Sequence, residues 1–138
     1  MRLLAVLGLA ASLTAPVAYA AEWVVTAHND DLIDEIDVSS IRRDGPYIKV
    51  WTRANYRIER VASDGQKFKS QLTQYYYHCP KRQAALVQLT SFSEFNGSGR
   101  VIRSASVPFK SSDLEDIIPG SIMEGTHDDA SKRAKGIK

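Results

Sequence analysis

Apolar and polar side chains alternate along much of the chain with the period of two that is typical of β-strands. Over residues 47–53, Ile48, Val50 and Thr52 fall on one face, while Trp51 adds apolar bulk to the other. A strand with apolar bulk on both faces suits the interior of a sheet. The pattern therefore predicts an interior strand here.

Five further runs have the residue types or the alternation of strands. They cover residues 22–27, 32–42, 67–79, 82–95 and 100–107. The Ala/Leu/Gln-rich start of residues 82–95 also suits a helix, but the Thr-Ser-Phe-Ser-Glu-Phe end favours a strand. Turn-forming residues separate several of the runs, namely Asp44-Gly45, Ser63-Asp64-Gly65 and Asn96-Gly97-Ser98-Gly99.

One helix is predicted near the end of the chain, from Ile122 to about Lys135. Ser121 provides an N-cap, and Glu124 lies three residues later, as in a capping box. Because consecutive strands are joined by short hairpins, we expect them to pair antiparallel. The predicted fold class is α+β, with a mainly antiparallel β-sheet of about six strands and one C-terminal α-helix packed on it.

The first twenty residues have a different character. Arg2 precedes an apolar run from Leu3 to Leu13, shorter than the ~20 residues of a membrane helix, and the segment closes on Ala18-Tyr19-Ala20. This is the pattern of a cleaved secretory signal. We therefore expect cleavage after Ala20, a single domain over residues 21–138, and a periplasmic or secreted product. No cysteine follows the signal and no later apolar run is long enough to span a bilayer, so neither a lipid anchor nor a transmembrane segment is expected.

The formal net charge of +2 does not indicate a nucleic-acid partner, but the charges are segregated along the chain. Residues 21–41 carry six acidic groups and no basic ones, and so do residues 111–131. Residues 42–110 carry thirteen basic groups and four acidic ones. Either these segments pair with one another across the fold, or the basic segment forms a face that attracts an anionic partner.

No motif indicates an enzyme. Cys79 is the only cysteine, which excludes a disulfide within the chain and favours a buried thiol over intermolecular pairing. His28, His78 and His127 lie in different predicted elements without the spacing of metal ligands. His78 and Cys79 are neighbours on a strand and point to opposite faces, which argues against a nucleophilic pair. We therefore predict a protein without catalytic, metal or cofactor sites.

Basic and aromatic side chains in the middle of the chain make a candidate binding face. Tyr75 and Tyr77 share one side of their strand, opposite Tyr76, and rings interleaved with cations suit the binding of sugars or proteins. The candidate residues are Lys49, Arg53, Lys67, Lys69, Tyr75, Tyr77, Arg82, Arg100 and Arg103. Alternatively, the tyrosines belong to the core and to cross-strand pairs.

Several motifs occur in a recognisable order. Trp23 is followed by Asp37-Val38-Ser39-Ser40-Ile41-Arg42-Arg43-Asp44-Gly45, Val50-Trp51, Tyr77-His78-Cys79 and Ile118-Pro119-Gly120-Ser121. In this order the chain resembles the surface-adhesin protein E domain family of exported Gram-negative proteins, over nearly its whole mature length. The resemblance implies a curved antiparallel sheet of about six strands with a C-terminal helix against it.

The resemblance also implies a function, namely adhesin-like recognition of a macromolecular partner from the host matrix or the bacterial envelope. The alternative is a periplasmic, envelope-associated structural or interaction protein, which could form a homodimer through a sheet edge. In the family a disulfide ties the helix to the sheet, but the predicted helix of this chain has no cysteine. Because Ile122 and Met123 are few apolar contacts and Gly125 weakens a helix, we expect loose docking or fraying beyond His127.

Overall fold

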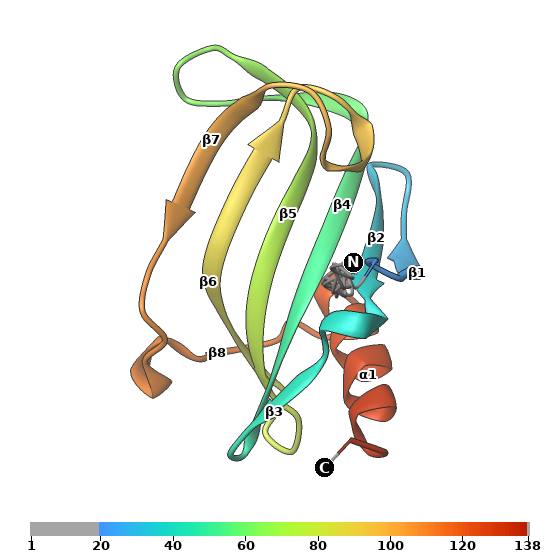
Figure 1. The fold of residues 1–138 in the computed structure, drawn as a ribbon, viewed down its shortest axis with the longest axis vertical. Coiled ribbons are helices and arrows are strands. Elements are labelled where there is room, and N and C mark those ends of the chain that lie inside the picture. Colours follow the sequence, from blue (N-terminus) through green and yellow to red (C-terminus); the bar gives the residue numbers. More distant parts are fainter. Residues whose placement is uncertain (1–19, 138) are drawn as a thin grey trace, which may run out of the picture.

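Figure 1 shows a curved antiparallel sheet with one helix, α1, against one side. This computed structural model describes residues 20–137. The signal segment predicted over residues 1–20 lies outside the described residues, except for Ala20.

The main path of the sheet contains six strands in the order β1-β2-β4-β5-β6-β7, all paired antiparallel. Their bounds are Trp23–His28 (β1), Leu32–Asp37 (β2), Tyr47–Val61 (β4), Lys67–His78 (β5), Gln83–Phe92 (β6) and Val101–Ser106 (β7). Two short strands, β3 (Arg42–Asp44) and β8 (Glu115–Asp116), pair with β4 and β6. Three 3-10 turns, η1 (Val38–Ser40), η2 (Phe95–Gly97) and η3 (Ser111–Asp113), precede α1 (Ile122–Ala134). The predicted fold class is therefore confirmed.

Two strand boundaries differ from the prediction. The strand expected over residues 32–42 is broken by η1, because the Asp37 side chain accepts a hydrogen bond from the Ser39 N–H at 3.0 Å and caps a turn there. β4 continues to Val61 instead of ending at Arg53, because its hairpin with β5 extends as far as the pair Val61–Lys67.

The core lies between the sheet and α1. Ile36, Ile48 and Val50 are at most 1% exposed and belong to one cluster with Tyr77 from β5. β4 pairs with β2 on one side and β5 on the other, so the prediction of an interior strand is confirmed.

The helix is docked more closely than the sequence suggests, and the expected fraying beyond His127 is wrong. α1 is helical to Ala134, and Ala130 and Ala134 are at most 1% exposed. A Cβ atom at Gly125 would lie 3.1 Å from the Ala27 Cβ, so the missing side chain lets the helix lie against β1. An estimate from apolar side-chain area alone therefore underestimates how firmly a helix is docked when its backbone lies close to the sheet.

Polar contacts also hold the end of α1. The Arg43 guanidinium donates to the carbonyl oxygens of Ala134, at 2.8 Å, and Ile137. The Ala134 carbonyl belongs to the last turn, whose acceptors have no partner within the helix, and Ile137 follows the end of α1. Among the described residues, no helix has both the length and the apolar character needed to cross a bilayer.

Candidate binding site

The nine residues of the predicted binding face do not lie on one surface. Tyr77 is fully buried in the core, with its ring stacked on that of Tyr75 at 5.6 Å between centroids. Tyr76 lies on the opposite side of the sheet and stacks on Phe109 at 4.1 Å. The alternation of the three tyrosines is therefore as predicted, but Tyr75 and Tyr77 are on the helix side and Tyr77 is a core residue.

Two of the basic candidates, Lys49 and Arg53, lie on the sheet face opposite α1. We call this face, which also carries Trp51 and Tyr76, the open face. Arg53 is already engaged there. Its Nε donates to Glu35 Oε2 at 2.7 Å, its Nη2 donates to Oε1 at 3.1 Å, and its guanidinium lies 4.3 Å from the Trp23 ring centroid. The Lys49 ammonium lies 5.6 Å from the ring centroid of Tyr76.

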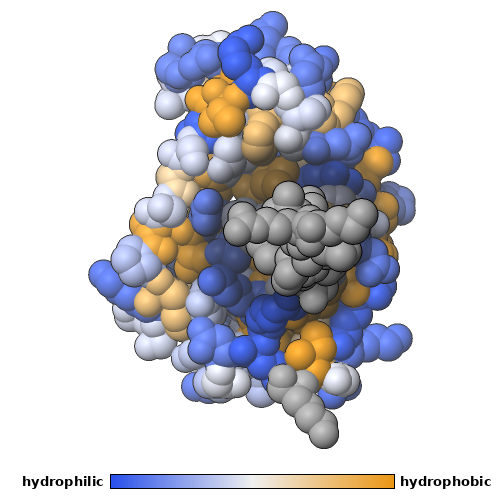
Figure 2. Space-filling model, in the orientation of Figure 1, coloured by the Kyte–Doolittle hydropathy of each residue, from blue (hydrophilic) through white to orange (hydrophobic). Residues whose placement is uncertain are grey.

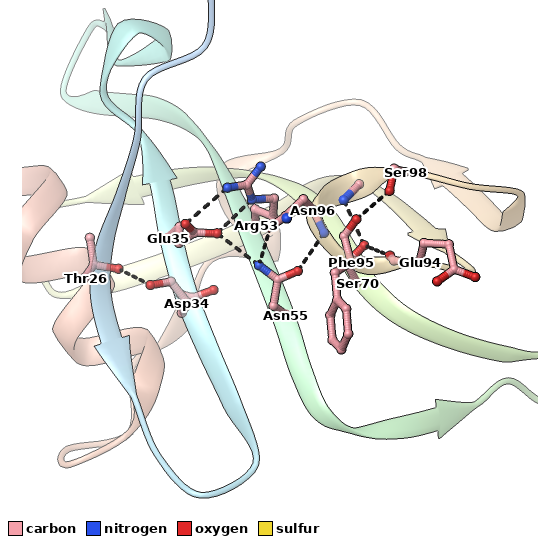
Figure 3. Close-up of polar contacts among 11 residues, drawn as sticks. Thr26, Asp34, Glu35, Arg53, Asn55, Ser70, Glu94, Phe95, Asn96 and Ser98 are labelled. Carbon is pink, nitrogen blue, oxygen red and sulfur yellow. Dashed lines mark hydrogen bonds and ion pairs between the residues drawn. The ribbon is translucent and has the colours of Figure 1, made fainter.

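A network of polar side chains extends from Arg53 to the β6–β7 connection (Figure 3). Asn55 donates through Nδ2 to Glu35 Oε2 and to Asn96 Oδ1, both at 3.1 Å. The Asn96 N–H donates back to Asn55 Oδ1 at 2.8 Å, and Ser70 Oγ donates to the Glu94 carbonyl at 2.5 Å. The network therefore fixes η2 on β4 and β5 and leaves Arg53 in a structural role.

Arg82 lies in the β5–β6 turn, at the other end of the sheet, and joins that turn to α1. Its guanidinium forms ion pairs with Glu124 at 3.0 Å and Asp128 at 2.9 Å. Hydrogen bonds from His127 and Arg82 lower the pKa of the Asp128 carboxyl. Together with the pair of Arg53 and Glu35, these contacts join acidic segments to the basic one, as the first interpretation of the charge pattern predicts.

The remaining four candidates gather at the hairpin end, the end of the sheet formed by the β4–β5 hairpin and the β6–β7 connection (Figure 1). Exposed apolar side chains accompany them here, and orange residues lie among blue ones at this end of Figure 2. The apolar residues are Ile58, Val61, Phe95 and Val101, which are 46–70% exposed. The basic residues are Arg60, Lys67, Lys69, Arg100 and Arg103. Three acidic residues, Glu59, Asp64 and Glu94, lie among them.

The helix side of the sheet contains a groove that the sequence analysis did not predict. It consists of two cavities, of about 500 Å³ and about 280 Å³, which share Tyr75, Ser121 and Met123 in their walls. We call them together the helix-side groove. The smaller cavity reaches the buried Asp34, and no local motif in the sequence indicates that this aspartate turns inward.

Burial controls the titration of the groups around the smaller cavity. Desolvation raises the pKa of Asp34 to about 6, although a hydrogen bond from the Thr126 hydroxyl, at 2.5 Å, acts in the opposite direction. Burial likewise raises the pKa of Tyr75 to about 12 and that of Tyr77 well above its usual value. A carboxylate with such a shift inside a cavity is a common feature of functional sites.

Cys79 and His127 show no arrangement for catalysis. Cys79 is half-buried, and its Sγ accepts a hydrogen bond from the Ser131 hydroxyl at 2.6 Å. The Nδ1 atom of His127 lies 3.0 Å from an Asp128 carboxylate oxygen, which indicates a proton on Nδ1. Over residues 20–137, no three His, Cys, Asp or Glu side chains converge as metal ligands.

In a comparison with protein families, the family model of surface-adhesin protein E matches residues 23–128. The chain belongs to the surface-adhesin protein E family. The similarity that the sequence motifs indicated is thus confirmed. No curated protein matches the chain at a significant level.

Solved structures of this family share the fold. The structure of Haemophilus influenzae protein E matches with a TM-score of 0.58 and 16% identity, over 91% of this chain and 96% of that chain. Crystal form II of the same protein matches with a TM-score of 0.60 and 14% identity, over 85% and 92% of the two chains. At these identities the structural likeness shows the common fold.

Proposed function

We propose that this member of the surface-adhesin protein E family is an exported, non-enzymatic domain that recognises a macromolecular partner of the host matrix or the bacterial envelope. Export would follow from cleavage after Ala20, with release to the periplasm or beyond. The family supports an adhesin, and the hairpin end supplies the surface that suits such recognition.

The observation that carries this proposal is the exposure of large apolar side chains beside cations at the hairpin end. Ile58 is 70% exposed and Val61 is 62% exposed, and the Lys69 ammonium lies 5.5 Å from the ring centroid of Phe95. Protein interfaces combine a small apolar or aromatic centre with a polar rim. The cations here form two ion pairs, Lys67–Glu59 at 3.9 Å and Lys69–Glu94 at 3.4 Å. Both are at least partly exposed, and exposed pairs of this kind cost little to break when a partner docks.

Binding of residues 21–138 to immobilised matrix and envelope proteins, measured at low and high salt, tests this proposal. We expect replacement of Val61 and Phe95 by serine to weaken binding at least ~10-fold, because interface anchors carry most of the energy. Replacement of Lys67, Lys69, Arg100 and Arg103 by serine should weaken binding mainly at low salt. Equal binding by wild-type protein and both variants would rule out the hairpin end.

The matched control for the charge variant removes basic residues elsewhere. Lys132 and Lys135 lie on or directly after α1 and are exposed. Their replacement by serine should leave partner binding unchanged. A loss of binding as large as that of the hairpin-end variant would indicate attraction by overall charge instead of a defined surface.

A second candidate function, self-association through a sheet edge, is favoured by β7. Five of its six residues are exposed, and it lies at the end of the strand order. The Val107 N–H donates to the Val87 carbonyl within the sheet, at 2.9 Å. Because N–H groups alternate in direction along a strand, those of Ser106 and Ser104 point outward and are free to pair with another chain.

Proline substitutions in β7 distinguish the loss of edge pairing between two chains from the loss of folding. Ser106→Pro removes an outward N–H and should abolish a concentration-dependent dimer while leaving the monomer folded. Ala105→Pro removes an inward N–H and should instead reduce stability. Sedimentation velocity checks the first expectation, and a wild-type protein that stays monomeric at high concentration would eliminate this candidate.

A further inference from the structure

The helix-side groove has one buried end and one exposed end. Asp34, which is 9% exposed, and the fully buried Tyr77 line the buried end. Asp113, Glu115 and Asp116, all exposed, line the other. The two cavities together have a volume in the range that accommodates a small organic molecule.

One carboxylate oxygen at the buried end has no donor among the described residues. Asp34 Oδ2 accepts from the Thr126 hydroxyl, but within residues 20–137 no group donates to its Oδ1. Asp34 lines the cavity, so its Oδ1 can accept hydrogen bonds from a ligand there that brings donors. An ammonium group brings three donors and no acceptor.

The charge of the lining residues is negative at both ends. Of the described residues, no Lys, Arg or His lines either cavity, whereas the buried end has Asp34 and the exposed end has the three acidic residues. Between the ends, Tyr75 and Met123 form an apolar waist that belongs to both cavities. Aromatic faces also attract cations. This arrangement suits a molecule with a cation at each end and an apolar chain between them.

We propose that the helix-side groove binds a linear aliphatic diamine or polyamine, with one ammonium group on Asp34 and another at the acidic exposed end. The methylene chain then lies across Tyr75 and Met123. The groove lies on the helix side, away from the open face and from the apolar tips of the hairpin end. This site therefore does not depend on the proposed function, and either can fail without the other.

Calorimetric titration of residues 21–138 with cadaverine and spermidine tests the proposal, with pentylamine as the probe that has one ammonium group. We expect both polyvalent amines to bind and pentylamine to bind at least ~10-fold more weakly, because it loses one charged contact. No binding at millimolar concentration, or equal affinity for cadaverine and pentylamine, would overturn the proposal.

Variants at both ends of the groove locate the site. Asp34→Asn should weaken cadaverine binding at least ~10-fold, and the double variant Glu115→Gln with Asp116→Asn should weaken it several-fold. Glu59→Gln removes one negative charge at the hairpin end and serves as the matched control, with unchanged affinity. An Asp34→Asn variant that binds as tightly as the wild type would contradict the proposed pose.

Met123 provides a direct reporter of occupancy, because it is the only methionine in residues 21–138. Its methyl resonance should shift on addition of cadaverine in the wild type and in Glu59→Gln, but much less in Asp34→Asn. Binding detected by calorimetry without any shift of this resonance would place the amine elsewhere on the acidic surface and overturn the assignment.

Discussion

Replacing Asp34 by asparagine is expected to raise the free energy of unfolding by about 2 to 3 kcal/mol at pH 7. The pKa of this carboxyl is about 6 in the folded protein, against an ordinary value of 3.8, mainly because burial penalises its charged form. Each unit of such a shift corresponds to about 1.4 kcal/mol. An asparagine side chain has the same shape, still accepts the Thr126 hydrogen bond through its oxygen, and carries no charge to desolvate.

The effect should depend on pH in a defined direction. Because the folded state holds the Asp34 proton more tightly than the unfolded state, the wild type is stabilised relative to the variant at low pH and loses that stability as pH rises. The difference between the two proteins should be near zero below about pH 4, grow between about pH 4 and 6, and stay constant above. The titratable groups that act on Asp34, or on which it acts, are Glu35, Tyr56, Tyr75 and Tyr77.

Urea unfolding of both proteins at several pH values between 4 and 8 measures this difference, and comparison of the two proteins cancels the contributions of the other carboxyls. Asp37 provides the matched control, since it is a similarly buried aspartate on the same strand. Its Oδ1 accepts hydrogen bonds from the Glu22 N–H, the Ser39 N–H and the Ser39 hydroxyl. Asp37→Asn should therefore lower stability, by about 1 kcal/mol or more. Equal and pH-independent effects of the two changes would refute the role of burial at Asp34.

The second large effect is expected at the ion pair of Glu35 and Arg53. Both side chains are 13% exposed and meet through two hydrogen bonds. Glu35→Gln leaves the guanidinium largely desolvated without its counterion, so we expect the free energy of unfolding to fall by about 2 kcal/mol. Arg53→Met should cost a similar amount, because it leaves the carboxylate and also removes the contact with the Trp23 ring.

A double-mutant cycle isolates the interaction itself. The double variant should lose less than the sum of the single changes, with a coupling of about 1 to 2 kcal/mol. The exposed pair of Lys67 and Glu59, with side chains 67% and 38% exposed, is the matched control and should couple by less than about 0.5 kcal/mol. Identical coupling in both cycles would show that burial does not strengthen the Glu35–Arg53 pair.

These two predictions have different meanings for function. The charges of Glu35 and Arg53 pair with each other, so their network stabilises the fold and positions η2. Within residues 20–137, only one oxygen of the Asp34 carboxylate has a hydrogen-bond donor, and this group is ionised at neutral pH at a cost in stability. A cation bound in the helix-side groove would offset that cost. Binding of a cation would therefore explain why a carboxylate that destabilises the fold lies in this cavity.

Features that depend on neighbouring residues in the chain were predictable from the sequence. The alternation of Ile48, Val50 and Thr52 predicted an interior strand, and the order of the turns predicted antiparallel hairpins. The capping box of Ser121 and Glu124 correctly located the start of α1, where the Ser121 hydroxyl accepts the Glu124 N–H. Such signals arise from backbone geometry and local hydrogen bonds, which act within a few residues.

Features that depend on contacts between distant residues were decided by the tertiary structure. The sequence placed nine residues on one face, but Tyr77 faces α1, Arg53 pairs across β2 and β4, and Arg82 joins a turn to the helix. Gly125, which weakens an isolated helix, allows this one to lie against Ala27. The groove and the protonation of Asp34 depend on residues from β2, β5 and α1 that are far apart in the chain. Local sequence therefore determined the strands, the turns and the helix start, whereas desolvation and long-range packing determined which charges are free to bind.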